Sequence, residues 1–538
     1  MNDMRITKQT SNYETIETLL TRLENFTDCD VQRLSDNEII ITCHANKTVA
    51  ICDWLANTEH CRTGGIIAEE TDSEWELCYV LYSMEHNSLF NIIVRQSLDN
   101  TSFESVSVPV HAFDWHEREI EDVFELDFKG HPRLGDFVLH DEQWIEGLSP
   151  MRRQFISAAA LEEQNERDWK PRRILVAPGA FVMPVGPVFS GISSPVNYLI
   201  ETVGEEVIRS YPRLFYNYKG IEKVFEQKSI DEGLLLSERF AQSTAISHGV
   251  TYCNAIEKIF GVSIPDRALI LRGFLAELER IRHHTGVITE IIESTALGIA
   301  ASEVSIAEEE LLRLTAKLTG HRYGINMICP GGMRRDISDQ PVKQASNEVN
   351  DITESLMDLQ IALSHSSSFL DRLEQVGKLN KSDISTYGLV GPIARASGIS
   401  SDLRKGLPYG IYSEYGIQEQ ILFEGDNYAR LRVLFDEIAE SNSLCATFAN
   451  AISKYSITRI ELPQVAIQES ALGWVEAPQG ANFFFVRIDS DNKIVRTRIM
   501  PPAFANWHGL HKATEGFAFQ DFPICLSTLG LSVGENDR

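Results

Sequence analysis

Three ionisable residues, Glu277, Arg280 and His284, recur at helical spacing within a long predicted helix. Spacings of three and then four residues place them on one helix face, apart from the main apolar stripe. Two interpretations of this trio stay open. The trio forms either a solvated charged face, or a set in which His284 and a basic group point at a redox centre and tune its potential by hydrogen bonding.

A second candidate is the segment Pro330-Gly331-Gly332-Met333-Arg334-Arg335-Asp336, which combines a flexible turn with two adjacent arginines. Guanidinium groups bind carboxylates and phosphates through paired hydrogen bonds. Read locally, Arg334, Arg335 and Asp336 favour structural ion pairs over catalysis.

Several familiar kinds of site are disfavoured by spacing or charge. The nine cysteines form no C-x-x-C pair, so we expect no iron–sulfur or zinc site held by this chain alone. No G-x-S-x-G or H-E-x-x-H motif occurs. The stretch 473–480 lacks phosphate-loop spacing and predicts a tight turn between strands. A formal charge of -28 argues against nucleic acid as a partner.

The elements that must position these residues begin with an N-terminal α+β region. Apolar spacing predicts a helix over 13–23, and strand-like runs cover 38–42, 75–82 and 89–94. A charged stretch over 162–173 then predicts a linker. No run of about 18 apolar residues occurs and the N-terminus lacks an apolar leader, so we expect neither a transmembrane helix nor a secretory signal.

The remainder of the chain has mostly helical periodicity. Alternation up to residue 208 predicts strands, and the helical pattern then runs from 214 to about 319, with a long helix over 267–288. Further helices are expected over 348–375 and 425–455, and a hairpin around Asp489–Asn492. We therefore predict an α+β protein with a small α+β domain over 1–160, a linker over 161–175, and a mainly helical domain with peripheral β-structure over 176–538.

Short segments along the chain resemble, in order, two proteins of respiratory complex I. The pattern Glu117-Arg118-Glu119-x-x-Asp122-x-Phe124, followed by Gly130-His131-Pro132, resembles the family of its C-type subunit. Everything after about residue 175 resembles its D-type subunit and the related large subunit of [NiFe]-hydrogenases of the formate hydrogenlyase and hydrogenase-4 type. The segments that carry this second resemblance are 218–223, 237–239, 277–284, 330–336, 391–398, 476–480 and 534–538. The resemblance implies a fused C–D arrangement with a hydrogenase-large-subunit-like second domain.

The resemblance also assigns expected roles to individual residues. Arg239 and His284 match positions that face the terminal [4Fe-4S] cluster of a neighbouring subunit, which favours the cluster-facing interpretation of His284. The segment with Glu117, Arg118, Glu119 and Asp122 is expected to dock the two halves of the chain or neighbouring subunits. Arg334, Arg335 and Asp336 are expected to hold a subunit interface by ion pairs.

The residues that handle the final substrate in each branch of the family are replaced. Hydrogenases need two C-x-x-C pairs for nickel and iron. Here Ala241 and Thr244 stand at the first pair, and Cys525, with Thr528 three residues on, is a lone thiol near the C-terminus. The resemblance therefore implies that no nickel or other metal is bound.

The polar residues of a quinone pocket are replaced as well. Phe189 stands where the quinone-binding branch has a histidine, and Gln242 stands where it has a tyrosine. His248, one helical turn beyond Thr244, either substitutes for them or is a core histidine. A quinone remains possible as a ligand, shaped by apolar groups.

The expected function is that of an electron-transfer or coupling subunit of an NADH:quinone oxidoreductase-like or hydrogenase-4-like complex. It would bind no cofactor alone and would pack on a [4Fe-4S] protein that resembles the B-type iron–sulfur subunit of complex I. Membrane partners would be antiporter-like proteins and relatives of the H-type subunit, at the cytoplasmic face of the inner (plasma) membrane. The alternatives are a [NiFe]-hydrogenase large subunit and a non-redox structural scaffold.

Overall fold

The computed structural model describes the whole chain except residues 1–18, 24–28, 146, 157–177 and 189–193. Helices make up 45% and strands 20% of it, in several small sheets, which confirms the predicted α+β class. Most of the helix predicted over 13–23, the linker over 161–175 and Phe189 lie outside the described residues. Among the described helices, none combines the length and apolar character needed to cross a membrane.

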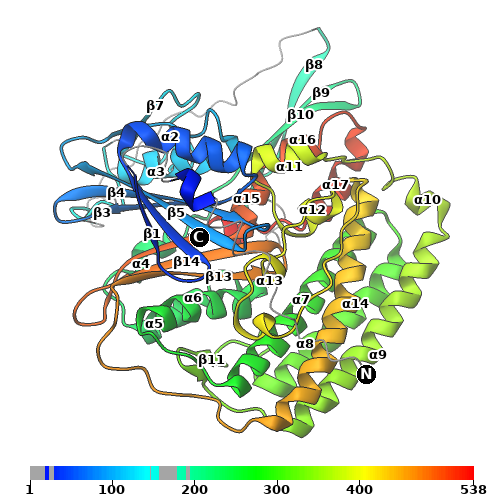
Figure 1. Cartoon of the computed structure of the whole chain (residues 1–538). Helices are drawn as coiled ribbons and strands as arrows, with labels where there is room; N and C mark the ends of the chain where they lie inside the picture. The colour runs from blue at the N-terminus through cyan, green and yellow to red at the C-terminus, as the bar shows by residue number, and fades with distance from the viewer. Residues whose placement is uncertain (1–18, 24–28, 146, 157–177, 189–193) are drawn as a thin grey trace.

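A five-stranded sheet in the order β1-β2-β5-β4-β3 forms the centre of the N-terminal region (Figure 1). Strands β2 and β5 run parallel, and the other neighbours are antiparallel. The bounds are Cys29–Arg33 (β1), Glu38–Cys43 (β2), Arg62–Glu70 (β3), Glu74–Ser83 (β4) and Ser88–Ser97 (β5). The runs predicted over 38–42, 75–82 and 89–94 are therefore confirmed as β2, β4 and β5.

Side-chain alternation divides this sheet into two buried faces. Ile66 and Tyr79 belong to the core beneath helices α2 (Ala45–Asp53) and α3 (Asp114–Phe124), whereas Ile67 belongs to a separate core shared with a second sheet. That sheet consists of β13 (Ser470–Ala477), β14 (Gly480–Ile488) and β15 (Ile494–Met500). The tight turn predicted for 473–480 is confined to residues 478–479, because the rest of that stretch belongs to β13 and β14. The predicted hairpin around 489–492 is confirmed.

Four long helices pack side by side in the second domain (Figure 1). They are α7 (Asp266–Ser294), α8 (Gly298–Thr319), α9 (Asp339–Ser364) and α14 (Asn427–Ala451). The helix predicted over 348–375 starts earlier and ends at Ser364, where the serine-rich run 364–368 follows. Serine hydroxyls compete with helical hydrogen bonds, which accounts for the early end. Helix α14 starts after Asp426, whose side chain accepts a hydrogen bond from the Ala429 amide.

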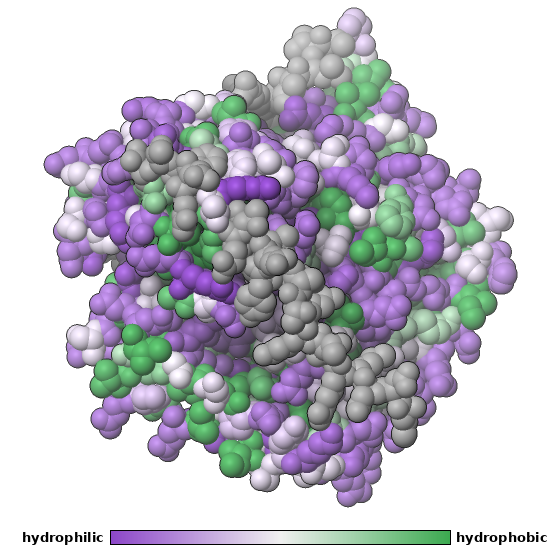
Figure 2. Space-filling view, viewed as in Figure 1, coloured by the Kyte–Doolittle hydropathy of each residue, from purple (hydrophilic) through white to green (hydrophobic). Residues whose placement is uncertain are grey.

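The remaining elements connect the two regions. A three-stranded sheet of β8 (Ala180–Val185), β9 (Asn197–Val203) and β10 (Glu206–Arg213) extends from the body of the protein (Figure 1). Helix α6 (Ala245–Ile259) packs on β13 and β14, and the short helices α15 to α18 over 502–536 pack against both regions. On the face shown in Figure 2, hydrophilic residues dominate the described surface and apolar residues form scattered groups.

Candidate functional site

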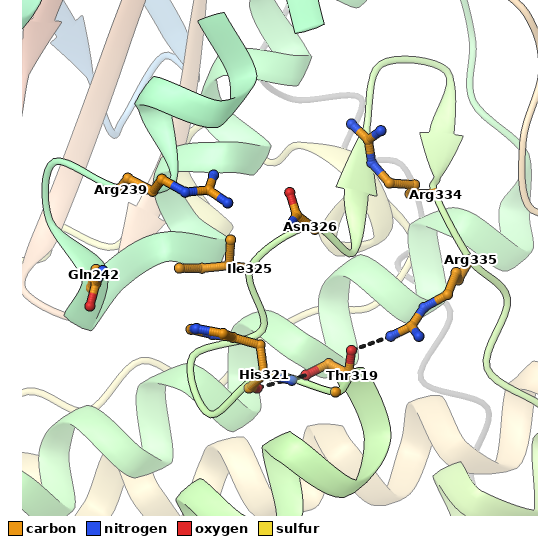
Figure 3. Close-up of a pocket in the computed structure, with 9 residues that line it drawn as sticks. Arg239, Gln242, Thr319, His321, Ile325, Asn326, Arg334 and Arg335 are labelled. Atoms are coloured by element: carbon orange, nitrogen blue, oxygen red, sulfur yellow. Dashed lines mark hydrogen bonds between the residues drawn. The ribbon is translucent and has the colours of Figure 1, made fainter. Parts of the chain in front are cut away.

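A surface pocket of about 460 Å³ collects four of the residues predicted from sequence. They are Arg239, Gln242, Arg334 and Arg335, and they come from two segments far apart in the chain (Figure 3). The turn over 238–244 supplies the first two, and the hairpin of β11 (Ile328–Cys329) and β12 (Gly332–Met333) leads into the other two. Thr319, Gly320, His321, Ile325 and Asn326 complete the wall.

Two glycines fix the path of this hairpin. Gly331 and Gly332 have φ values of 85° and 142°, a region that residues with a side chain rarely adopt. A Cβ on either glycine would overlap a backbone oxygen of the segment 458–460. The hairpin therefore lies directly against this segment and delivers Arg334 and Arg335 to the pocket.

The pocket carries positive charge, and none of the described residues that line it is a carboxylate. Arg239 and Arg334 keep 40% and 39% of their side chains exposed. The Arg335 guanidinium donates to the neutral Thr319 carbonyl (Figure 3), and among the described residues it forms no ion pair with a carboxylate. Arg334 lies 3.8 Å from the exposed carboxylate of Asp231, a separation too long for a strong ion pair.

The carboxyl group beside Arg239 compensates it only in part. Burial raises the pKa of Glu238 to about 7, although the Asn326 amide and Arg239 act to lower it. Near neutral pH, Glu238 is therefore protonated in a large fraction of molecules. Three arginines with so little counter-charge, on a chain with a formal charge of -28, form a site suited to an anionic group.

The trio on α7 is buried, which overturns the solvated-face interpretation. Glu277, Arg280 and His284 have exposed fractions of 0%, 1% and 0%. Glu277 accepts two hydrogen bonds of 3.0 Å from Arg404. Arg280 donates to the carbonyls of Glu476 and Ala477 at 2.7 and 3.2 Å.

His284 belongs to an interior ion network rather than to the pocket. Its Nε2 lies 2.9 Å from Glu437 Oε2, and Arg395 donates through Nε to Glu437 Oε1 at 2.6 Å. Arg395 also binds Glu476 at 2.7 Å. Burial lowers the pKa of His284, and Glu437 opposes that shift. Arg239 and His284 thus lie in different environments, one at the pocket and one in the interior.

The three positions considered for a quinone pocket are not brought together among the described residues. Gln242 lines the pocket. His248 is fully buried, with its Nε2 2.8 Å from Glu535 Oε1. Phe189 lies outside the described residues. His248 is therefore buried like a core histidine, and its imidazole has a carboxylate partner.

Helix α3 joins the two regions through buried charges. Glu119 accepts hydrogen bonds from Arg498 at 2.6 Å and from Arg538 at 2.9 Å. Glu117 accepts from the Val106 amide at 2.7 Å. Two further predicted residues bind within the N-terminal region, since Arg118 stacks on Phe137 and Asp122 accepts from the amides of Phe137, Val138 and Leu139. Asp336 pairs inside the chain with Arg267 at 2.9 Å.

Sequence reasoning missed the partners of these groups. Arg395, Glu476 and Glu535 fall within the short segments that carry the family resemblance, so a signal for them existed. Glu437 lies on α14 with no such signal. Two of the positions compared with metal-binding cysteines, Thr244 and Cys525, also have separate partners. The Thr244 hydroxyl donates to Glu535 at 3.3 Å, whereas the Cys525 thiol donates to the Ala513 carbonyl.

Two family patterns match successive parts of the chain. "Respiratory-chain NADH dehydrogenase, 30 Kd subunit" matches residues 41–160, and "Respiratory-chain NADH dehydrogenase, 49 Kd subunit" matches 303–471 and 448–538. Formate hydrogenlyase subunit 5 of Escherichia coli is 26% identical over 86% of this chain and 81% of its own length. Hydrogenase-4 component G of the same organism is 27% identical over 86% of this chain and 80% of its own length.

Relatives from other complexes have similar sequence identities and coverages. The C/D subunit of the NADH-quinone oxidoreductase of Acinetobacter baylyi is 23% identical over 87% of this chain and 85% of its own. A chain of the membrane-bound sulfane sulfur reductase, an archaeal respiratory membrane complex, has the same fold. Its TM-score is 0.63 at 24% identity, and the match covers 68% of this chain and 100% of that one.

Proposed function

Because the chain fuses domains of the 30 kDa and 49 kDa subunit types of respiratory-chain NADH dehydrogenase, we propose that it is an electron-transfer or coupling subunit of a multisubunit oxidoreductase. The named relatives are subunits of formate hydrogenlyase, hydrogenase-4 and NADH-quinone oxidoreductase. The assembly is a complex of that class at the membrane, on its cytoplasmic face. NADH and quinone are the electron donor and acceptor to test first.

The observation that carries the proposal is the cationic pocket around Arg239. Its three arginines need an anionic counterpart that the wall of the pocket does not supply. An iron–sulfur subunit docked there would provide it, with its [4Fe-4S] cluster facing Arg239. Arg334 and Arg335 would bind acidic groups of that subunit at the rim, because guanidinium groups recognise carboxylates in paired hydrogen bonds.

Copurification tests this docking. We would express the tagged full chain with its neighbouring subunits and extract the complex in mild detergent. Arg334→Glu combined with Arg335→Glu should reduce the recovered iron–sulfur subunit at least tenfold. Arg313→Glu is the matched control, since its side chain is 74% exposed on α8 and pairs with Glu309 on the same helix. Full recovery of the subunit with the double variant would contradict the docking site.

A redox measurement separates an electron-transfer role from a purely structural scaffold. Arg239→Gln removes a positive charge from the pocket and should lower the midpoint potential of the neighbouring cluster, because the oxidised, less negative state is then favoured. An unchanged potential in an intact complex would favour the scaffold. Metal analysis of the purified chain should find no stoichiometric nickel, because Ala241 and Thr244 lack the thiolates that hydrogenases use.

A further inference from the structure

Two cysteines stand directly opposite each other at the edge of the N-terminal sheet. Strand β1 is an edge strand of this sheet (Figure 1), and its antiparallel register with β2 places Cys29 opposite Cys43. The register runs without a shift from one end of β1 to the other. Residues that stand opposite each other in such a ladder project from the same face of the sheet, so the two thiols share one face.

The hydrogen bonds of the hairpin set how closely the two cysteines approach. The Leu34 amide donates to the Glu38 carbonyl at 2.9 Å, so Leu34 and Glu38 form a hydrogen-bonded pair. Hydrogen-bonded and non-hydrogen-bonded pairs alternate along an antiparallel ladder, and counting back from Leu34 makes Cys29 and Cys43 a non-hydrogen-bonded pair. The Cα atoms of such a pair are about 4.5 Å apart, within the range of about 4.4–6.8 Å that disulfides require.

Both side chains pack on the same apolar core. Cys43 is 7% exposed and belongs to the core beneath α2 and α3, and Cys29 packs against this core. Burial raises the pKa of Cys43 to about 11, the Thr48 hydroxyl acts to lower it, and the Cys29 thiol raises it further. The electrostatic effect of Cys29 on Cys43 agrees with two neighbouring thiols on one face.

Other thiols of this region are placed differently. Eight of the nine cysteines are buried, and Cys29 is partly exposed. Cys52 of α2 also interacts electrostatically with Cys43, but it is fully buried. Cys78 of β4 stands opposite Ile67 of β3 and Ile93 of β5. Cys29 is therefore the thiol that a small oxidant in solvent reaches first, and Cys43 is the thiol across the ladder from it.

We propose that Cys29 and Cys43 form a reversible disulfide between β1 and β2, made by exchange with a small-molecule disulfide of the glutathione type. The Cys29 thiolate attacks one sulfur of the small disulfide, which releases one thiol and leaves Cys29 in a mixed disulfide. The Cys43 thiolate then attacks the Cys29 sulfur and releases the second thiol. Two protein thiols are oxidised, the small disulfide is reduced to two thiols, and these carry away both protons.

The cross-link fastens an edge strand to its neighbour. Among the described strands, β1 is hydrogen-bonded to β2 alone. A disulfide closes the loop 29–43 covalently and so opposes the separation of the two strands. Disulfides in a reducing compartment are transient and follow the thiol pool, so the cross-link forms when the ratio of oxidised to reduced small thiol rises. The reaction needs no other subunit and does not rest on the proposed function.

Peptide mapping of the purified full chain tests the cross-link. We would reduce the chain, equilibrate it with oxidised and reduced glutathione over a series of ratios, block the remaining thiols with N-ethylmaleimide, and digest it with trypsin. Trypsin separates the two cysteines, because it leaves Cys29 in the peptide 23–33 and Cys43 in the peptide 34–47. The two peptides should be linked in at least half of the chains at the most oxidising ratio and unlinked at the most reducing one.

Variants separate the two chemical steps. Cys43→Ser should stop at the mixed disulfide on Cys29, whereas Cys29→Ser should leave Cys43 as an unmodified thiol. Cys52→Ser is the matched control, since it removes a buried thiol of the same core and should retain the linked peptides. Circular dichroism confirms the fold of each variant. In the cross-linked wild type, deuterium exchange of the β1 amides should be at least tenfold slower than in the reduced chain.

Two further measurements identify Cys43 as the attacking group and the sheet as the cause of its proximity. The second step should accelerate about tenfold per pH unit between about pH 7 and 9, because the pKa of Cys43 is raised to about 11. In concentrated urea, the same linkage should need at least tenfold more oxidised glutathione, because the ladder no longer holds the thiols opposite each other.

The cross-link is overturned if the wild type carries only the mixed disulfide on Cys29 at every ratio. A linkage of Cys43 to Cys52 would overturn it equally, because the thiols across the ladder would then not be the ones that meet. The same glutathione requirement in the folded and the urea-unfolded chain would show that the sheet has no part in it. All of these results are obtained on the isolated chain, so they stand apart from any failure of the chain to assemble into an oxidoreductase.

Discussion

Glu119 and Arg538 form a buried ion pair that joins helix α3 to the end of the C-terminal segment. Arg538 Nη2 donates to both Glu119 carboxylate oxygens at 2.9 Å. Arg498 donates to the same carboxylate at 2.6 Å, so one glutamate holds two guanidinium groups from the second domain. Because the three side chains are nearly inaccessible to water, the two regions unfold only by exposing these charges.

Glu119→Gln should therefore destabilise the whole chain. It leaves Arg498 and Arg538 with only the longer contacts of 3.4 Å to Glu222, and breaking a buried pair from one side costs about 3–5 kcal/mol. Urea unfolding followed by tryptophan fluorescence measures the change. Glu104→Gln, on the exposed surface of β6 (Ser102–Glu104), is the control and should change stability by about 0.5 kcal/mol or less. Equal midpoints for the two variants would contradict the role of Glu119.

The same carboxylate makes stability depend on pH in the acid range. Burial raises the pKa of Glu119, but Arg498 and Arg538 outweigh it and lower the pKa to about 2. The folded state thus holds its proton less tightly than the unfolded state. The stabilisation is fully present above the ordinary glutamate pKa and is lost as pH falls from about 4.5 toward 2. Between these pH values, the unfolding free energy of Glu119→Gln should fall less with decreasing pH than that of the wild type.

Sequence periodicity predicted the helix and the shared face of Glu277, Arg280 and His284, but not their surroundings. The partners Arg404 and Glu437 lie more than 120 residues away. The packing of α14 against α7 brings Glu437 near, whereas Arg404 comes from the separate short helix α13 (Leu403–Gly406). A charged helix face has the same local pattern whether water or buried counter-charges neutralise it. Burial was thus the property that local spacing could not predict.

For the pocket residues, the property that the sequence did not predict was their proximity. Arg239, Gln242, Arg334 and Arg335 were each singled out from short motifs, and the fold places all four around one cavity. Their separation in sequence gave no indication of this proximity, which depends on the hairpin at Gly331 and Gly332. The candidate residues could therefore be predicted from local motifs, whereas their assembly into one site could be seen only in the tertiary structure.

His116 should destabilise the protein at moderately acidic pH. Burial and then Arg498 lower its pKa to about 3, so the folded chain keeps this imidazole neutral while the unfolded chain protonates it near pH 6.5. The unfolded state binds more protons between those values, so stability falls as pH drops, by up to about 1.4 kcal/mol per pH unit. His116→Gln should reduce this loss of stability between pH 6.5 and about 3. His365→Gln, at an exposed position, should leave it unchanged.

Arg395→Met should destabilise the interior more than any surface arginine variant. It leaves the Glu437 and Glu476 carboxylates buried without their guanidinium, a loss of about 3–5 kcal/mol. Arg313→Met is the control, because its exposed pair with Glu309 contributes about 1 kcal/mol or less. Chemical denaturation measures both. A loss below about 1 kcal/mol in Arg395→Met would show that the network is replaceable by apolar packing.

Gly391 fixes the start of α12 (Gly391–Ala396), the helix that carries Arg395, and an alanine there should be poorly tolerated. Its φ is 68°, and a Cβ would overlap the Gln479 carbonyl in the turn between β13 and β14. The left-handed conformation alone costs a residue with a side chain about 1–2 kcal/mol. Because the overlap adds to this cost, we expect Gly391→Ala to lose at least about 2 kcal/mol of unfolding free energy.

Gly298→Ala provides the comparison for Gly391→Ala. Gly298 is the first residue of α8, and a Cβ there meets no atom within 4 Å. Alanine at such a position restricts the unfolded chain and stabilises by about 0.4–1 kcal/mol. The two variants should therefore shift the denaturant midpoint in opposite directions. If Gly391→Ala unfolded at the wild-type midpoint, the contact between α12 and the β13–β14 turn could not be what positions Arg395 against Glu437.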